Sequence, residues 1–167
     1  MFDAAFFRDV MGHYPTGVCV VTSTDGRGAP LGMSVGTFTS VSLDPPLVAF
    51  LPKKGSRTWA QIERRGRFCV NVLGARQQHL SRRFAAPSED RFAGVAYRPS
   101  RLGCPVLAGV VAWIDCRLDA VHAAGDHLIV VGAVEALDAE GAGEPLVYHR
   151  GAYNQPAPLP LEAAAAS

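Results

Sequence analysis

The chain has 167 residues, of which 49% are hydrophobic and 19% are charged, and its formal net charge is +1. This length and composition predict one globular domain with a sizeable core. The near-neutral charge argues against a dedicated nucleic-acid-binding protein, whose basic balance would extend over the whole chain. The longest apolar run, residues 106–114, is far too short to cross a bilayer. No basic segment precedes an apolar stretch at the N-terminus, so we expect no signal peptide, no membrane partner and a cytoplasmic location.

Helical periodicity at the N-terminus gives way to strand patterns. Residues 3–13 predict a short amphipathic helix with Asp3 as its N-cap. We expect the apolar side of this helix to be buried, and it carries Phe6, Phe7, Val10 and Met11. β-branched and alternating patterns then predict four strands, over residues 18–23, 29–35, 40–43 and 47–51.

The rest of the chain predicts two further helices and more strands. The helices are expected over residues 56–65 and 76–84. The remaining strands are predicted over residues 68–73, 110–122, 127–137 and 146–149. Residues 87–105 show no regular pattern and predict an irregular excursion. We assign residues 1–154 to the domain and expect residues 155–167 to form a flexible or surface-lying tail.

Six or seven strands with short turns, and helices only as insertions, predict an antiparallel barrel or sandwich. The chain lacks the alternating strands and helices, and the G-x-G-x-x-G fingerprint, of a doubly wound dinucleotide-binding fold. The four cysteines show no C-x-x-C spacing, so we expect reduced, buried thiols. His13, His79 and His122 are scattered and lack a companion at metal-ligand spacing, so no metal site is predicted.

Residues 53–83 hold nine Lys and Arg residues and a single acid, Glu63. Such a local excess of positive charge attracts anions. Ser56, Arg57 and Thr58 stand where a helix is expected to begin. Free N–H groups at a helix start, two hydroxyls and a guanidinium together suit a phosphate. The alternative is that a hydroxyl simply caps the helix and the arginines are solvated; the surrounding charge favours an anionic ligand.

Eight short segments stand out in their order along the chain: PTGVCVVTS (15–23), TSVSLDPPLVAF (39–50), GSRTW (55–59), FCVNVL (68–73), QQHLSRRFA (77–85), DRFAG (90–94), GDH (125–127) and PLVYHRGAY (145–153). Together they resemble the flavin reductase-like family, whose members have an FMN-binding split β-barrel. No segment is decisive alone, but the resemblance covers residues 6–153. It implies a mainly β fold: a six- to seven-stranded antiparallel split β-barrel of Greek-key topology with a few flanking helices, assembled as a homodimer.

The same resemblance implies one flavin, FMN or FAD, in each subunit near the dimer interface. Ser56 and Thr58, with the adjoining Arg57, would bind the flavin phosphate, and Arg83 would be its charged partner. The isoalloxazine ring would be lined by Ser34, Val35, Gly36, Thr37, Phe38 and Ser40. The family usually has Thr followed by Asn, Ser or Ala in this segment, so Gly36 implies a ring held more loosely or by backbone alone.

On the open side of the flavin, His127, His149 and Tyr153 would lie where the nicotinamide of NADH or NADPH stacks, with His127 as the candidate catalytic residue. Alternatively, Asp126 closes a hairpin turn and His127 merely starts a strand, while Tyr153 packs at an interface. Asn71 is polar within an apolar strand. It is either a core anchor, which we favour, or a flavin contact.

The resemblance implies an NAD(P)H:flavin oxidoreductase that transfers hydride from the nicotinamide to the flavin and supplies reduced flavin to a partner monooxygenase. Two alternatives stay open. The protein could retain its flavin and act directly on an organic substrate held by residues 87–105, or it could be a non-catalytic flavin- or haem-binding module. The sequence does not distinguish FMN from FAD, or NADH from NADPH.

Overall fold

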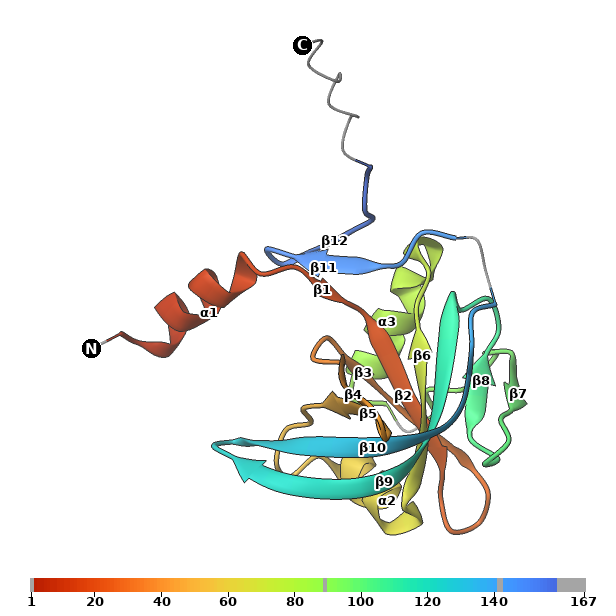
Figure 1. Cartoon of the computed structure of the whole chain (residues 1–167). Helices are drawn as coiled ribbons and strands as arrows, with labels where there is room; N and C mark the ends of the chain where they lie inside the picture. Colours follow the sequence, from red (N-terminus) through yellow and green to blue (C-terminus); the bar gives the residue numbers. More distant parts are fainter. Residues whose placement is uncertain (1, 89, 141–142, 159–167) are drawn as a thin grey trace, which may run out of the picture.

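The computed structural model describes residues 2–88, 90–140 and 143–158. Its largest element is a seven-stranded antiparallel sheet (Figure 1) with the strand order β3-β2-β6-β9-β10-β5-β4. These strands are β2 (Cys19–Thr24), β3 (Pro30–Val35), β4 (Thr39–Leu43), β5 (Pro46–Phe50), β6 (Arg67–Val72), β9 (Ala112–Ala124) and β10 (His127–Asp138). Each lies within a few residues of a predicted strand, so the prediction of a mainly β, antiparallel fold is confirmed.

Among the residues that the structure describes, two smaller sheets accompany the large one. The first has the order β1-β11-β12, formed by β1 (Thr16–Gly17), β11 (Val147–His149) and β12 (Ala152–Asn154). The second pairs β7 (Tyr97–Pro99) with β8 (Pro105–Leu107). The prediction that residues 87–105 are wholly irregular was therefore wrong. Three-residue strands bounded by proline are too short to show a period of two, and proline is confined to strand ends and edges.

The large sheet is open at both edges. Within the described ranges, β3 and β4 each pair with one neighbour, so the hydrogen bonds of the protomer do not close a barrel. The sheet nevertheless bends, because the pairing of β10 with β9 shifts register between Val131 and Gly132 and again between Val134 and Ala136. A Cβ atom at Gly132 would lie 2.4 Å from Cζ of Phe68, so glycine lets that ring pack directly on the strand.

Three α-helices and one 3-10 helix accompany the sheets in the described part of the chain. They are α1 (Ala4–Gly12), α2 (Arg57–Arg65), the 3-10 helix η1 (Ala75–Gln77) and α3 (Gln78–Ala85). α2 begins after Ser56, whose Oγ accepts a hydrogen bond from the backbone N–H of Trp59 at 3.2 Å, and it ends at Gly66, whose φ is +62°. Among the described helices, none is long and apolar enough to cross a membrane.

The buried apolar side chains form two clusters. In one, Leu80 and Phe84 of α3 pack with side chains of β2 and β8. In the other, Trp59 and Ile62 of α2 pack against Phe50 and Phe68 of the large sheet. The ring centroids of Phe50 and Trp59 are 5.6 Å apart with an interplanar angle of 79°, which is the edge-to-face geometry that aromatic pairs prefer. α2 and α3 are therefore each fixed to the sheet by an apolar face.

α1 follows its prediction only in part. Asp3 caps it, because its Oδ1 accepts hydrogen bonds from the N–H groups of Ala5 at 3.0 Å and Phe6 at 2.8 Å. The expectation of a buried apolar side was wrong for the protomer, in which α1 has no buried residue and extends away from the sheet (Figure 1). The four apolar side chains remain exposed: Phe6 60%, Phe7 53%, Val10 50% and Met11 50%. The helical pattern identifies an apolar face but not what covers it.

The four cysteines are free and buried, as predicted. Burial raises the pKa of the Cys104 thiol to about 11 and the pKa values of Cys19 and Cys116 to about 12. Thiols with such high pKa values stay protonated near neutral pH and are poor nucleophiles. Across the described ranges, no group of three His, Cys, Asp or Glu side chains is placed to hold a metal ion.

Asn71 is fully buried in β6 and joins three strands. Its Nδ2 donates to the carbonyl of Val20 at 3.1 Å and to Oγ1 of Thr22 at 3.0 Å. Its Oδ1 accepts a hydrogen bond from the N–H of Leu107 at 2.8 Å. Because these bonds satisfy both ends of the amide with protein partners, the favoured interpretation as a core anchor is confirmed.

We predict that Asn71→Leu lowers the free energy of unfolding by about 2–3 kcal/mol, because the buried N–H of Leu107 loses its acceptor and the β2 groups lose a donor. Urea unfolding followed by circular dichroism measures this change. Asn154→Ala, at an exposed amide in β12, is the control and should change the free energy of unfolding by less than about 0.5 kcal/mol. Equal effects of the two substitutions would contradict the anchor role.

Candidate functional site

The start of α2 presents the hydroxyls that the sequence singled out. Ser56 accepts the N–H of Trp59 through its Oγ, so the hydrogen of the same hydroxyl stays available to donate to another group. The first turn of any helix also leaves N–H groups without an intrahelical partner. Capping and anion binding are therefore compatible at Ser56, and the two interpretations drawn from the sequence do not exclude each other.

Thr58 lies in the first turn of α2 and contacts an arginine that the sequence analysis did not single out. Nη1 of Arg91 donates to Oγ1 of Thr58 at 3.1 Å and to the carbonyl oxygen of Gly32 in β3 at 2.8 Å. Both Thr58 and Arg91 line a cavity of about 710 Å³, together with Arg57 and Gln61. This volume lies within the usual range for cofactor and ligand pockets.

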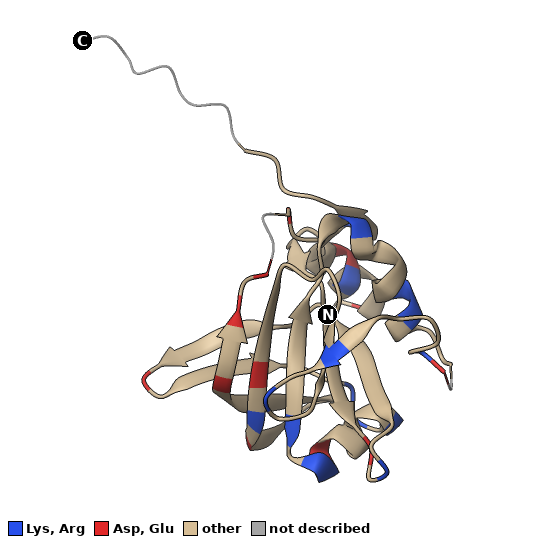
Figure 2. Ribbon diagram, turned by 90° about the vertical axis from the view of Figure 1, so that its right-hand side faces the viewer, with Lys and Arg blue, Asp and Glu red and all other residues tan. Residues whose placement is uncertain are grey.

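The basic residues of the 53–83 stretch do not gather in this cavity. Of the nine, Arg57 alone is among the described residues that line it. Arg64 and Arg65 occupy the last turn of α2, and Arg82 and Arg83 the last turn of α3. Figure 2 shows Lys and Arg residues spread over several elements instead of forming one field. Sequence proximity overstated the local charge because successive helices and strands carry their side chains to different faces.

Arg83 has a protein partner of its own. Its Nη1 donates to the carbonyl oxygen of Ala93, in the segment that follows α3, and its side chain is exposed. Arg83 is not among the described residues that line the cavity beside Thr58. Its predicted role as charged partner of a phosphate stays a prediction, and the structure places Arg91 nearer to Thr58.

The segment expected to line a flavin ring, residues 34–38, is held at three points. Oγ of Ser34 lies 3.1 Å from Oγ of Ser81 in α3. A Cβ atom at Gly36 would lie 3.1 Å from Oγ1 of Thr16, so the chain approaches β1 closely there. Oγ1 of Thr37 accepts a hydrogen bond from the N–H of Leu51 at 3.0 Å. These contacts fix the path of a backbone that the glycine alone would leave free.

The remaining predicted ring contacts differ in their exposure. Val35 is buried in the cluster beneath α2, with 7% of its surface exposed, and Phe38 packs against the same cluster. Ser40 lies on the edge strand β4, opposite Val48 of β5, and is exposed. The side chain of Val35 therefore serves the core, and any contact of Val35 with a ligand would come from its backbone.

A chain of hydroxyls connects this segment to the C-terminal strands. Oγ of Ser81 lies 3.0 Å from Oη of Tyr153 in β12 as well as near Ser34. The guanidinium of Arg82 lies 5.5 Å from the centroid of the Tyr153 ring, within the range of a cation–π interaction. Ser34 and Tyr153, predicted to touch the same flavin, are thus joined through Ser81. The sequence signal that could have identified Ser81 is a small hydroxyl between Leu80 and Phe84 on the buried face of a helix.

His149 lies in β11, where it pairs with Ala152 of β12, so it belongs to the same small sheet as Tyr153. The turn between them contains Arg150, whose φ is +49°, and the N–H of Arg150 donates to the carbonyl of Gly12 at 3.0 Å. The small sheet is thereby tied to the end of α1. His149 and Tyr153 share one hairpin, but Tyr153 pairs with Tyr148 and His149 with Ala152, so their side chains point to opposite faces of the small sheet. Their predicted roles stay predictions.

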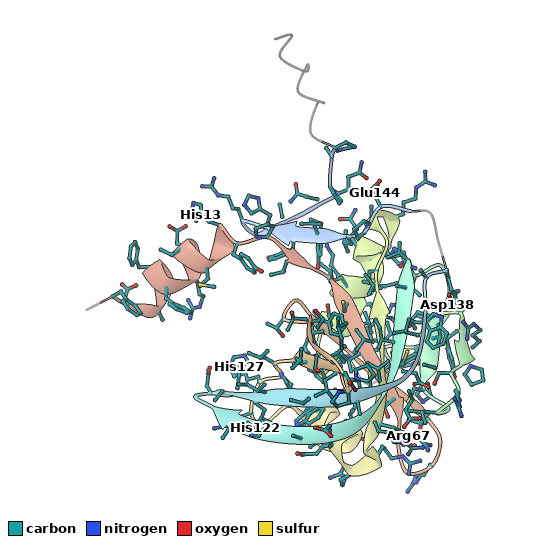
Figure 3. All side chains as sticks on the ribbon, in the orientation of Figure 1. His13, Arg67, His122, His127, Asp138 and Glu144 are labelled. Carbon is teal, nitrogen blue, oxygen red and sulfur yellow. The ribbon has the colours of Figure 1, made fainter. Side chains whose placement is uncertain are left out.

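His127 begins β10 and lies beside the segment that leads into α2. Its backbone forms an isolated β-bridge with Lys53, and the N–H of Lys54 donates to the carbonyl of Asp126 at 2.9 Å. Nδ1 of His127 lies 2.8 Å from Oδ1 of Asp126, and this contact lowers the pKa of the Asp126 carboxyl. The imidazole is 42% exposed and lies toward the free end of the β9–β10 hairpin, as does His122 (Figure 3). Both expected features are present: Asp126 closes the turn, and His127 starts the strand with an accessible ring.

These elements form a small, mainly β protein in which hydroxyls and a guanidinium stand at the start of a helix beside a cavity. A sequence profile for the family described as "Flavin reductase like domain" matches residues 11–157. The chain is 54% identical to a flavin reductase from Pseudomonas putida over 151 residues, which make up 90% of this chain and 89% of that protein. It is 46% identical over 153 residues to HsaB of Mycobacterium tuberculosis, the reductase subunit of a flavin-dependent monooxygenase, covering 90% of this chain and 81% of HsaB.

Solved structures agree with the sequence comparison. The NADH:FAD oxidoreductase SgcE6 of Streptomyces globisporus C-1027, in complex with NAD and FAD fragments, superposes with a TM-score of 0.88 at 36% identity, covering 93% of this chain and 94% of that one. The chain belongs to the flavin reductase-like family. The predicted resemblance is confirmed, and with it the prediction of a flavin-reducing enzyme whose relatives include reductase subunits of two-component monooxygenases. The roles of individual residues stay predictions.

Proposed function

We propose that this protein is an NADH- or NADPH-dependent reductase of FMN or FAD that supplies reduced flavin to a partner monooxygenase. The observation that carries the proposal is its 54% identity, over nine-tenths of both chains, to a flavin reductase. Further support comes from the relatives that act as reductase subunits of monooxygenases. The chemistry is the transfer of hydride from C4 of the nicotinamide to N5 of the flavin, and it belongs to the two nucleotides.

The protein's own contribution is to position both nucleotides and to stabilise charge. Ser56, Arg57 and Thr58 hold the flavin phosphate at the start of α2; Arg57 and Thr58 line the cavity, and Ser56 immediately precedes them. Hydroxyl hydrogens, helix N–H groups and a guanidinium together suit a dianion. The backbone N–H groups of residues 36–38 and Ser40 face the ring where negative charge develops on reduction, near N1 and O2. The contacts to Thr16, Leu51 and Ser81 support this role because they prevent the segment from shifting.

On the other side of the ring, His127, His149 and Tyr153 contact the nicotinamide. The partly exposed imidazole of His127, fixed by Asp126, supports this role. Tyr153 is held by Ser81 and Arg82, which restricts its ring to one position. Pre-ordered contacts of this kind reduce the entropy lost when two rings are stacked.

The assembly is a homodimer, with one flavin in each subunit near the interface between the two. The support is the apolar surface that the protomer leaves uncovered on α1 and at Leu43 of β4, which is 94% exposed. Large exposed apolar surfaces of this kind mark protein interfaces. The four buried free thiols suit the cytoplasm, where cysteines are kept reduced.

A steady-state assay that crosses NADH and NADPH with riboflavin, FMN and FAD tests the proposed activity. We expect oxidation of a reduced nicotinamide that depends on added flavin. If no flavin supports turnover, a flavin-retaining enzyme that acts on an organic substrate is favoured instead. A purified sample that is colourless, and stays so with FMN, FAD and haem, would contradict every role that depends on a bound cofactor.

The double substitution Ser56→Ala with Thr58→Ala tests the phosphate assignment. We expect the dissociation constant for FMN to rise roughly tenfold or more, because two hydrogen bonds to a charged group are lost. The protein should stay folded, since removal of an N-cap costs only about 1 kcal/mol. Quenching of flavin fluorescence measures the affinity, and an unchanged FMN titration would refute the assignment.

His127→Ala tests the nicotinamide side of the site. We expect the apparent KM for the nicotinamide nucleotide to rise severalfold while the KM for the flavin changes little, because the imidazole faces the hydride donor. His122→Ala is a matched control, since His122 is an exposed histidine on the paired strand β9. Equal increases in the two KM values for His127→Ala would indicate that His127 has a structural role and does not contact the nicotinamide.

Phe6→Asp with Val10→Asp tests the role of α1 in the homodimer. We expect the unchanged protein to sediment at twice its chain mass of 17.7 kDa, and the variant at that chain mass. The charged side chains would have to be desolvated at an apolar interface, which is costly. Arg8→Ala, on the same exposed helix, should remain dimeric. A monomeric wild-type protein at micromolar concentration would contradict the proposal.

A further inference from the structure

Arg91 connects three segments that are far apart in the sequence. Its Nε donates to the carbonyl oxygen of Ala86, just after α3, at 3.0 Å. Its Nη1 donates to the carbonyl oxygen of Gly32 in β3 at 2.8 Å and to Oγ1 of Thr58 in α2 at 3.1 Å. A guanidinium with donors in a fixed fork is well suited to such a junction, and it remains positively charged at any physiological pH.

The bond from Arg91 determines how the hydroxyl of Thr58 can be used. A threonine hydroxyl has one hydrogen to donate and lone pairs to accept with. Since Arg91 donates to Oγ1, the oxygen acts as acceptor on that side, and the hydroxyl hydrogen points elsewhere. An anion in the cavity is the acceptor that would complete this arrangement. Because the arginine side chain is already fixed by two carbonyl oxygens, little rotamer entropy remains to be lost on binding.

The cavity lining carries two bases, Arg57 and Arg91, and two acids, Asp25 and Asp90, so the position of hydrogen-bond donors and not net charge favours an anion at Thr58. Oδ1 of Asp25 already accepts hydrogen bonds from the N–H groups of Arg27 and Ala29, both at 2.8 Å. Asp90 is exposed to solvent. The two guanidinium groups are therefore the charges with donors beside the Thr58 hydroxyl.

We propose that Arg91 is a specificity-determining, positioning residue of the flavin phosphate site, which acts by orienting Thr58 and by adding positive charge beside it. The inference rests on the proposed function, since it assigns the phosphate at Thr58 to a flavin. It predicts that Arg91 sets the preference for phosphorylated flavins, FMN and FAD, over riboflavin. A role that only ties the segment after α3 to the sheet would affect all three flavins alike.

The experiment compares FMN with riboflavin, which carries the same ring and lacks the phosphate, in Arg91→Ala, Arg91→Lys and Thr58→Val. We expect the dissociation constant and KM for FMN to rise roughly ten- to fiftyfold in Arg91→Ala, with the riboflavin values within about twofold of the wild type. For Arg91→Lys, the dissociation constant and KM for FMN should lie between those of the wild type and those of Arg91→Ala. Lysine keeps the positive charge but lacks the forked donors of a guanidinium. Arg101→Ala, at an exposed arginine of the same excursion, is the control and should leave both flavins unchanged.

The double variant Arg91→Ala with Thr58→Val tests whether Arg91 acts through Thr58. We expect its FMN affinity to be close to that of the more affected single variant, because coupled residues are non-additive. The proposal is overturned if riboflavin and FMN weaken equally, if neither changes, or if the two single effects multiply. If Arg91→Ala does not fold, Arg91→Lys and Thr58→Val decide the question by the same comparison.

Phosphates of the nicotinamide nucleotide are the other source of the same anion chemistry. The KM for NADH, measured with riboflavin as acceptor, separates the two, because riboflavin removes the flavin phosphate from the assay. We expect this KM to be unchanged in Arg91→Ala. An increase would indicate that Arg91 contributes to binding of the nicotinamide nucleotide, and it would overturn the proposal. Separate fluorescence titrations with FMN and with riboflavin need no turnover. Their comparison therefore tests Arg91 even if the wild-type protein reduces no flavin.

Discussion

The packing of α2 against the large sheet is the constraint on which the rest of the site depends. Trp59 is 2% exposed and Ile62 1% exposed, and burying two such side chains contributes about 1.5–3 kcal/mol each. Their contact with Phe50 and Phe68 fixes the first turn of the helix relative to β5 and β6. Phe68 in turn lies over Gly132, where a larger residue would not fit. The apolar core therefore decides where Ser56 and Thr58 present their hydroxyls.

Side-chain hydrogen bonds between elements add to the restraint that the apolar core provides. Arg91 ties the start of α2 to β3 and to the end of α3, and the Ser34, Ser81 and Tyr153 hydroxyls tie β3 to α3 and β12. β3 is an edge strand, so these contacts hold an element that pairs with one neighbour among the strands that the structure describes. Side-chain bonds thus link the elements that are proposed to hold the flavin, which fits the need to hold binding groups in place before the ligands arrive.

The sequence predicted the elements whose signals are local. The β-branched run at 18–23, the Ser56 cap and the Gly66 stop each depend on a few neighbouring residues, and all are found. The family resemblance could also be recognised from the sequence, because it depends on the order of short segments along the chain and not on which residues these segments contact. Asn71 could be assigned to the core because an amide within an apolar strand must find partners there.

Features that depend on contacts distant in sequence could not be predicted. Arg91 lies 33 residues from Thr58, and nothing in its local pattern distinguishes it from the exposed arginines nearby. The nine basic residues of 53–83 looked like one field, but two helices and a strand direct them to different faces. The apolar face of α1 was recognised, but whether it packs on its own chain or on another is a question of assembly and not of periodicity.

The central claim is that the amino end of α2 holds the flavin phosphate, and a crystal structure of the FMN complex tests it most directly. The account predicts phosphate oxygens within about 2.7–3.2 Å of the Ser56 and Thr58 hydroxyls and the first N–H groups of α2, with Arg91 still bonded to Thr58. A phosphate bound at another element, with the cavity beside Thr58 filled by water or by the protein's own side chains, would contradict the account.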